Sequence, residues 1–400
     1  SIMKATRILS AIVIGAFAVF SFSCKKDSPT APDTPGPKPE NPDETVVPAP
    51  VPMDTLVYAF GQEAVKDQTY YYATIWKDGK RTLLSDGKYD AFCNAAFADN
   101  EYLYVVGCEA TGDLIDDGYY DPYNANRGVL WKVKIGDETN VTKTNLSDGK
   151  YNTSPIAVTV VDGKVYAAGF DTPKFDRRVI MWSDGQQEYL TDGSSDALAY
   201  CIYADGKDIY VGGYIQPADN KSGGIATIWK NGVAQSLTDG STVAKVNAIC
   251  VDNGKVYAAG AEKVSGGRWK GVLWIDGKAQ YFTEEAGTEV CGLYVKDGKY
   301  VISGNMTGTG SASDISVYVW TNDGATKISS DDVCQGTGLS VVGKDVYVCG
   351  NQFIGYTEDY MEIYNGHLWK NGELQTLEVE AQDYSLWGVT FASVPKNKPE

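Results

Sequence analysis

Histidine is almost absent from this 400-residue chain, which contains only His367. A Ser–His–Asp or Cys–His catalytic system needs a base with a pKa near neutrality, and zinc sites commonly use several histidines. His367 stands in the apolar run GHLWK and is expected to be an ordinary strand residue. No phosphate-binding loop or dinucleotide fingerprint occurs in a strand–helix context. The sequence therefore argues against the commonest hydrolase centres and predicts no cofactor.

Cysteine pairs with metal-binding or redox spacing are also missing. Seven cysteines follow Cys24 at irregular intervals, and no two of them form C-x-x-C. An odd count does not suit a disulfide framework, so we expect small apolar side chains inside strands and no metal site. Acidic oxygens do cluster in GDLIDDGYYD (112–121), but the spacing is not that of an EF-hand loop, so calcium is only weakly indicated. The seven are Cys93, Cys108, Cys201, Cys250, Cys291, Cys334 and Cys349.

Positive charge is in short supply. The chain has 35 Lys and Arg against 52 Asp and Glu, a net charge of −17. Residues 1–53 carry equal numbers of each sign, so the whole excess lies on residues 54–400. An acidic surface repels phosphate backbones, so nucleic acid is not an expected partner.

One long apolar run is present, Ile8–Phe20, between basic residues and SFSC. It has the order of a secretory signal and is short for a membrane-spanning helix. The cysteine directly after Ser23 makes residues 1–23 resemble a bacterial lipoprotein signal, which implies that Cys24 is lipidated. Ser21 departs from that pattern, because an aliphatic residue is usual there. The alternative is a plain secretory signal that is cleaved nearby.

Residues 24–53 are predicted to be a lipid-anchored tether. Residues 25–52 hold nine of the fifteen prolines, with many acidic and hydroxyl side chains. Such a segment cannot bury a core and is expected to be extended. The predicted location is an exported outer-membrane lipoprotein, facing the periplasm or the cell surface, that meets the membrane only through its anchor.

A tryptophan repeat organises the rest of the chain. Seven tryptophans follow one another at spacings of 55, 51, 47, 45, 46 and 49 residues. Five of them begin W-x-[D/N]-G, and Asp-Gly or Asn-Gly between apolar runs predicts a tight type I′ hairpin turn. A period near 45–50 residues with short strands is typical of propeller blades. The repeated residues are Trp76, Trp131, Trp182, Trp229, Trp274, Trp320 and Trp369.

Each repeat contains four expected strands, which makes the fold class all-β. Six complete units run from about residue 90 to residue 380. Three unmatched strands precede them, including YATIWKDG, and one unmatched strand, SLWGVTFASV, follows. These leftovers complement each other, so residues 54–400 are predicted to form one seven-bladed β-propeller. Pairing N-terminal strands with the C-terminal strand would close the ring and remove free sheet edges.

These repeats resemble a group of seven-bladed β-propeller lipoproteins of Bacteroidota-type bacteria. The resemblance covers nearly the whole chain but implies architecture without one shared activity. No Trp-Asp dipeptide of WD repeats and no Asp-box of sialidases occurs. The repeated tryptophans are expected to pack between neighbouring blades.

Candidate binding residues lie in the connections that share one face of such a propeller. The longest are 109–127 and 353–365, and both are rich in tyrosine and acidic residues. Aromatic rings offer apolar contact to sugars, and carboxylates accept hydroxyl hydrogen bonds. The alternative is that these rings only cover the ends of the blades. The aromatic candidates are Tyr119, Tyr120, Tyr123, Trp269, Tyr356, Tyr360 and Tyr364.

Three polar residues occupy one repeat position before the innermost strand of successive blades: Asp90, Asn152 and Asp196. We expect them at the mouth of the central channel, where they could line a one-sided ligand site. The alternative is turn chemistry, which favours Asp and Asn at such corners.

Three functions are consistent with these patterns. The favoured one is a non-catalytic, monomeric binding module for a glycan or an envelope protein. The second is a glycan-cleaving enzyme that uses Asp90 and Asp196. That reaction needs two carboxylates about 5–10 Å apart, and these two are expected on blades two apart. The third is a structural subunit of an envelope complex.

Overall fold

The computed structural model describes residues 52–116, 123–219, 223–309, 314–330, 333–358, 360–380 and 383–396. Every regular element in these ranges is a β-strand. It follows that the described part of the chain holds no helix that could cross a membrane. The predicted signal segment, Cys24 and nearly all of the predicted tether lie outside the described residues.

The strands follow one another with short connections, as repeated apolar runs and glycine turns predict. In chain order they are β1 (Met53–Ala64), β2 (Tyr71–Lys77), β3 (Lys80–Leu83), β4 (Ala91–Ala98), β5 (Tyr102–Ile115), β6 (Tyr123–Lys134), β7 (Asp137–Asn145), β8 (Asn152–Val161), β9 (Lys164–Thr172), β10 (Arg178–Ser183), β11 (Gln186–Tyr189), β12 (Ala197–Asp205), β13 (Asp208–Ile215), β14 (Ile225–Lys230), β15 (Val233–Ser236), β16 (Ala244–Asp252), β17 (Lys255–Lys263), β18 (Trp269–Ile275), β19 (Lys278–Tyr281), β20 (Thr288–Lys296), β21 (Lys299–Thr307), β22 (Ile315–Thr321), β23 (Gly324–Lys327), β24 (Cys334–Val342), β25 (Asp345–Tyr356), β26 (Glu362–Lys370), β27 (Glu373–Leu374) and β28 (Tyr384–Pro395).

Antiparallel four-stranded blades are the unit of the fold. Five sheets each contain four consecutive strands: β4–β7, β8–β11, β12–β15, β16–β19 and β20–β23. The remaining eight strands form one sheet, within which β26 and β28 are joined by a single parallel pair, Asn365 with Tyr384. On the far side of that junction, β1 pairs with β28 along its length, from Met53 with Pro395 to Glu63 with Tyr384. Strands from the two ends of the described chain therefore share one sheet.

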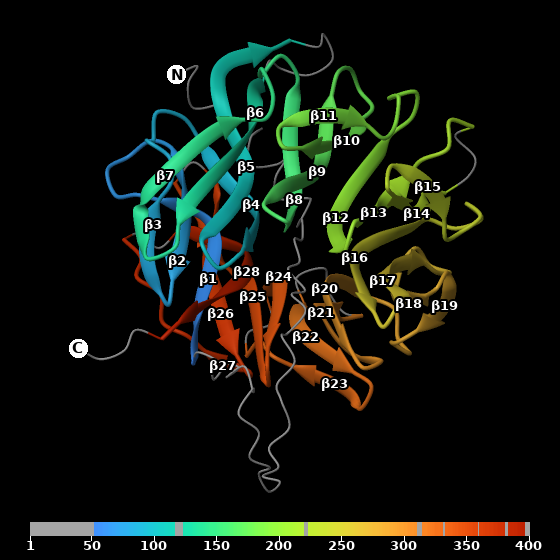
Figure 1. Cartoon of the computed structure of the whole chain (residues 1–400). Helices are drawn as coiled ribbons and strands as arrows, with labels where there is room; N and C mark the ends of the chain where they lie inside the picture. Colours follow the sequence, from blue (N-terminus) through green and yellow to red (C-terminus); the bar gives the residue numbers. More distant parts are fainter. Residues whose placement is uncertain are drawn as a thin grey trace, which may run out of the picture.

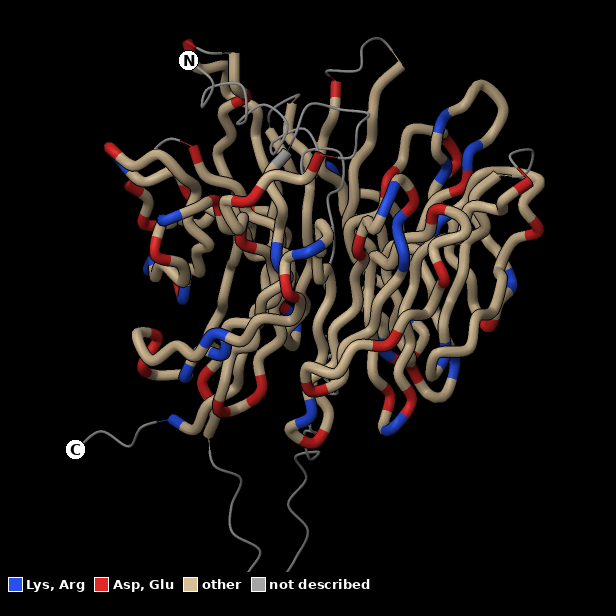
Figure 2. The backbone as a smooth tube through the Cα atoms, turned by 90° about the horizontal axis from the view of Figure 1, so that it is seen from above, with Lys and Arg blue, Asp and Glu red and all other residues tan. Residues whose placement is uncertain are grey.

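The first strands of the sheets lie at the centre of the molecule (Figure 1). They contact one another in the order β4, β8, β12, β16, β20, β24, β28 and back to β4. The fourth strands lie at the periphery, and Figure 2 shows charged residues mainly on turns and outer strands. The inner strands carry the apolar residues, so the core lies between the sheets.

The tight turns have the geometry that the sequence predicts. In the turn after Trp76, Asp78 and Gly79 have φ values of 45° and 84°. The Asp78 carboxylate also accepts a hydrogen bond from the Val57 amide at 3.0 Å. Positive φ at both central residues defines a type I′ turn, which explains why Asp or Asn precedes Gly.

The repeated motif [S/T]-D-G has a separate structural role in the connection between blades. Ser147 Oγ accepts the Gly128 amide at 3.0 Å, and Thr191 Oγ1 accepts the Val179 amide at 2.9 Å. The following Asp148 accepts the amide of Lys150 at 2.9 Å, which tightens the turn. In the four connections where it occurs, the motif therefore links the end of a blade to its third strand.

The repeated tryptophans pack between sheets, as predicted. All seven are buried, with exposed fractions of at most 5%. Trp131 belongs to a cluster with Phe60 and Ile75 of the preceding sheet. The Trp182 indole likewise reaches the preceding sheet's connection, where it donates to the Leu146 carbonyl at 3.0 Å. The seven predicted strand cysteines also lie in strands and are buried.

Each inner strand contains a β-bulge that the sequence patterns did not predict. The register slips by one residue where the first strand pairs with the second, for example at Asn94 in β4 and Ile156 in β8. A glycine of the second strand faces each bulge, and a Cβ built on it would lie 1.8–2.6 Å from a carbonyl oxygen of the first strand. The bulges thus explain the glycine that ends motifs such as YVVG and YAAG. These glycines are Gly61, Gly107, Gly169, Gly213, Gly260, Gly304 and Gly350.

Candidate functional site

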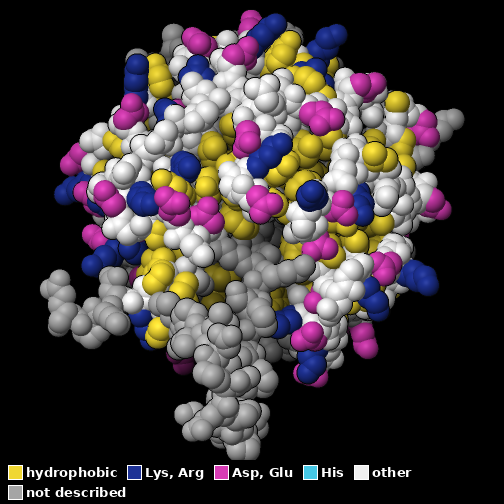
Figure 3. All heavy atoms as spheres, viewed as in Figure 1, with side chains coloured by type: hydrophobic (Ala, Val, Ile, Leu, Met, Phe, Trp, Pro, Cys, Tyr) yellow, Lys and Arg dark blue, Asp and Glu magenta, His cyan; other side chains and the backbone are white. Residues whose placement is uncertain are grey.

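The connections that carry most of the predicted aromatic residues share one face, here called the loop face. It bears the links between second and third strands and those between successive sheets. Figure 3 shows one face of the molecule, on which hydrophobic side chains lie between charged ones, and the loop face itself is described below from its contacts.

The longest predicted loop is partly a hairpin. β5 extends to Ile115 and β6 begins at Tyr123, so much of the segment 109–127 is paired strand. Backbone pairing satisfies N–H and C=O groups that a loop would leave to water. Tyr119 and Tyr120 lie outside the described residues, and only the backbone of Tyr123 is described. These three binding residues remain predictions.

The second aromatic segment also extends a hairpin, between β25 and β26. The Phe353 ring packs edge-on against Tyr356 and Tyr364, with centroid distances of 5.1 and 5.9 Å. The Tyr364 hydroxyl donates to Glu362 at 2.5 Å. Tyr360 at the turn is 87% exposed. The structure brings Tyr356 and Tyr364 together through Phe353, a residue that the sequence analysis did not single out.

The three predicted polar residues lie at the starts of inner strands, where their repeat position places them. Asp90 accepts the Tyr71 amide at 2.8 Å, and Asp196 accepts the Arg177 amide at 3.1 Å. Asp383, which the sequence analysis missed, accepts the Tyr364 amide at 3.3 Å before β28. The same bond in three sheets ties the loop before each inner strand to the preceding third strand, which gives these residues a structural role, and the ligand-binding role stays a prediction.

Asp196 also takes part in an ion pair with Arg177. Arg177 binds it through two nitrogens, Nε at 2.8 Å and Nη2 at 2.6 Å, and the Tyr214 hydroxyl donates to it at 2.7 Å. Burial alone would raise the pKa of Asp196, but the hydrogen bonds and charge of Arg177 hold it below its usual value. Asp196 is therefore a carboxylate at neutral pH.

Aromatic and charged groups continue from this ion pair across two more sheets. Tyr214 packs on Tyr200 with ring centroids 6.1 Å apart. The Lys245 ammonium lies 5.7 Å from the Tyr200 ring centroid and 4.6 Å from that of Trp269. It also forms an ion pair with Glu289 at 3.3 Å. The structure thus connects two predicted residues, Asp196 and Trp269, through side chains that sequence reasoning did not identify.

We call this set the mouth cluster, because its members lie at or near the starts of β12, β16 and β20 and in the adjoining hairpins. Lys263 completes it, with its ammonium 5.3 Å from the Trp269 ring. Three cations against two carboxylates give the cluster a local positive balance on an acidic protein. Its residues are Arg177, Asp196, Tyr200, Tyr214, Lys245, Lys263, Trp269 and Glu289.

The catalytic alternative finds little support in the carboxylates. A glycosidase general acid needs a raised pKa, whereas that of Asp196 is lowered. The pKa of Asp383 is raised by burial, and the hydrogen bond from the Tyr71 hydroxyl lowers it only in part. Asp383 is not, however, one of the two carboxylates in the predicted catalytic pair. His367 lies on β26, and its ring packs edge-on against Trp369 at 5.3 Å. Within the described ranges, no three Cys, His, Asp or Glu side chains are grouped as metal ligands.

Comparisons with known proteins find similarity only at the level of structure. No protein-family model and no curated protein sequence matches the chain. A Pyrococcus horikoshii acylaminoacyl peptidase aligns with a TM-score of 0.40 and 14% identity, over 85% of this chain and 62% of that one. The β-propeller domain of the Trilobed protease from Pyrococcus furiosus aligns with a TM-score of 0.46 and 12% identity, over 82% and 95%.

A third match is a structure from work on two prolyl endopeptidases, with a TM-score of 0.45 and 13% identity over 85% of this chain and 49% of that one. This chain therefore spans less than two thirds of the length of the acylaminoacyl peptidase and of the structure from the prolyl endopeptidase work. At this level of similarity, function has to be argued from the residues of the chain itself.

Proposed function

We propose that this protein is a non-catalytic binding module that takes a glycan at the mouth cluster. The observation that carries the proposal is the half-buried Trp269 ring, flanked by two ammonium groups and joined to Tyr200 through Lys245. Flat rings contact the apolar faces of sugars, and the surrounding charged groups can exchange hydrogen bonds with hydroxyls. The paired residues give this surface a fixed geometry before any ligand arrives.

We infer that the scaffold is a closed, seven-bladed propeller. Two features support this. The first strands form a cyclic series of seven contacts, and the eight-stranded sheet is two blades joined by one residue pair. Closure by β1 and β28 holds the starts of the inner strands in a ring, and loop residues on such a scaffold are well placed to bind.

We further propose that the module is displayed at the cell envelope. The supporting features are the lipoprotein-like signal, Cys24 and the proline-rich tether. A tether in extended conformation would hold the propeller away from the membrane. The partner is then a glycan of the envelope or of the surrounding medium.

The test is retention of the purified chain on a panel of immobilised polysaccharides, with sugar release followed in the same samples. Trp269→Ala should weaken retention on the bound polysaccharide at least about tenfold, the effect of losing an aromatic anchor. Tyr356→Ala, which removes an exposed ring elsewhere, is the matched control and should retain binding.

Other outcomes would redirect the assignment. Sugar release would support the glycan-cleaving enzyme. Loss of binding in Tyr356→Ala but not in Trp269→Ala would place the site on the β25–β26 hairpin. If no polysaccharide is retained, the protein-partner or structural-subunit alternatives are favoured, and crosslinking in the native envelope would test them.

A further inference from the structure

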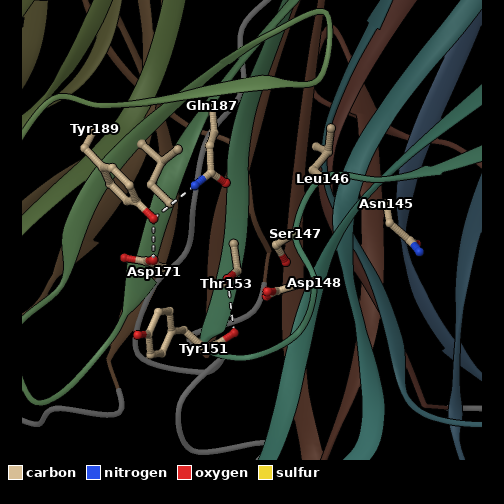
Figure 4. A pocket seen from close by; sticks show the side chains of 10 residues that line it. Asn145, Leu146, Ser147, Asp148, Tyr151, Thr153, Asp171, Gln187 and Tyr189 are labelled. Carbon is tan, nitrogen blue, oxygen red and sulfur yellow. Dashed lines mark hydrogen bonds between the residues drawn. The ribbon is translucent and has the colours of Figure 1, made fainter.

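A pocket lies apart from the mouth cluster, between the β4–β7 and β8–β11 sheets (Figure 4). Its volume is about 330 Å³, at the small end of the range for ligand pockets. We call it the side pocket. Its walls include residues 145–148, Tyr151, Thr153, Asp171, Gln187 and Tyr189.

One wall of the side pocket is fixed by an ion pair between a buried carboxylate and a partly exposed arginine. Asp171 is only 2% exposed, and Arg178 binds it through Nε at 2.9 Å and Nη2 at 2.7 Å. The Arg178 guanidinium lies 4.1 Å from the Tyr189 ring centroid and 5.7 Å from that of Tyr151. Gln187 donates to the Tyr189 hydroxyl at 3.0 Å. These contacts hold the two tyrosines in place, so the wall is preorganised.

The groups around the pocket define the chemistry of a ligand. Asp171 and Arg178 compensate each other's charge, and the exposed carboxylate of Asp148 disfavours an anion. Ser147 and Thr153 contribute hydroxyls, while Leu146 and the tyrosine rings contribute apolar surface. A small neutral molecule with several hydroxyls and an apolar face, such as a sugar unit, matches this combination.

The β16–β19 sheet repeats part of the same arrangement. Tyr281 occupies the position of Tyr189, and its hydroxyl donates to Glu262 at 2.9 Å. The Lys270 ammonium lies 4.5 Å from the Tyr281 ring, as Arg178 lies over Tyr189. A carboxylate, a cationic side chain and a tyrosine can thus stabilise the end of a blade. In the β8–β11 sheet a cavity lies beside these groups, and Tyr281, which does not line that cavity, supplies a matched control.

We propose that the side pocket is a second ligand site, which binds a neutral, hydroxyl-rich sugar unit independently of the mouth cluster. The pocket and the mouth cluster share no residue. Failure of one site therefore leaves the other intact, and the two proposals are separable by mutation.

The test is saturation-transfer difference NMR on the purified full chain with cellobiose, maltose, chitobiose and mannobiose as probes. At least one disaccharide should show transfer that falls at least about fivefold in Tyr189→Ala and is unchanged in Tyr281→Ala and Trp269→Ala. Asn145→Trp, an exposed rim position, should block the pocket without disturbing the core. Ser236→Trp is its control, because Ser236 pairs with Thr227 of β14 in the same way as Asn145 pairs with Val129 of β6. Thermal unfolding midpoints check that each variant is folded.

Four results would overturn the proposal. The first three are no transfer to any of the four disaccharides, transfer that survives Asn145→Trp in the folded protein, and transfer lost equally in Tyr281→Ala. Transfer that is lost only in Trp269→Ala would also overturn it, while supporting the mouth cluster as the sugar site.

Discussion

At the residue scale, the glycine facing each inner-strand bulge is the most constrained position in the repeat. The built Cβ at Gly107 would lie 1.8 Å from the Phe92 carbonyl oxygen, and the one at Gly213 would lie 1.8 Å from that of Leu198. The obstacle is backbone, which cannot rotate away as a side chain can. The same close approach recurs in every four-strand unit of the described chain.

We therefore expect Gly107→Ala to lower the free energy of unfolding by about 3 kcal/mol, the upper end of typical overpacking costs. Urea denaturation at pH 7 measures it. Gly224→Ala is the control, because its added Cβ would meet neighbours only at ordinary contact distances of 3.4 Å or more. Equal stability of the two variants would contradict the close approach at the bulge.

A second residue-scale prediction concerns pH. Asp196 has a lowered pKa in the folded chain, so its ionised form stabilises the fold above its unfolded pKa of about 3.9. That stabilisation is lost as the pH falls through the lower, folded pKa. Asp196→Asn should cost about 2 kcal/mol at pH 7, the value of hydrogen bonds to a charged group, and the difference from wild type should shrink below about pH 4. Urea denaturation from pH 7 to pH 3 tests this.

Asp383→Asn is the internal contrast. Burial raises the pKa of Asp383, so ionisation of this carboxyl opposes folding as the pH rises above about 4. As the pH rises from 3 to 7, the stability of Asp383→Asn relative to wild type should increase. Over the same range the stability of Asp196→Asn relative to wild type should decrease. Parallel pH profiles for the two variants would refute this assignment of opposite shifts.

At the element scale, the [S/T]-D-G motif decides how a blade's end meets its own third strand. The hydroxyl accepts a third-strand amide, and the aspartate closes a turn toward the next blade. Both are side chain-to-backbone bonds that the ladder itself does not supply. β11 ends at Tyr189, so the motif at Thr191 lies beyond the strand, in the connection to the next blade.

Thr191→Ala should remove the acceptor of the Val179 amide and cost about 1 kcal/mol. Amide hydrogen exchange should speed up at Val179 and in neighbouring residues of β10, while other sheets keep their protection. Thr144→Ala on the exposed face of β7 is the control and should change little. A uniform loss of protection across the molecule would argue against a local role.

At the scale of the whole molecule, the pairing of β1 with β28 makes the described chain's two ends interdependent. β28 contacts β4 and β24 and pairs with β1, so it links three neighbouring units. Without it, β1 would present an unpaired edge, and the cyclic series of inner-strand contacts would be interrupted.

Deletion of residues 384–396 should therefore abolish cooperative thermal unfolding and expose apolar surface to a dye such as ANS. Adding a synthetic peptide of residues 384–396 should restore the transition at least in part. A deletion variant that unfolds cooperatively near the wild-type midpoint would contradict this linking role for β28.

The sequence by itself determined the strands, the turns and the four-strand repeat, because these depend on local φ and ψ preferences and on hydrophobic periodicity. It also placed Asp90, Asn152 and Asp196 at the starts of inner strands. Only the tertiary structure decided which side chains meet across sheets. The contact of Lys245 with both Tyr200 and Trp269, and the pocket beside Asp171 and Arg178, depend on how neighbouring sheets are packed. No periodic pattern encodes that packing, because it joins residues far apart in the chain.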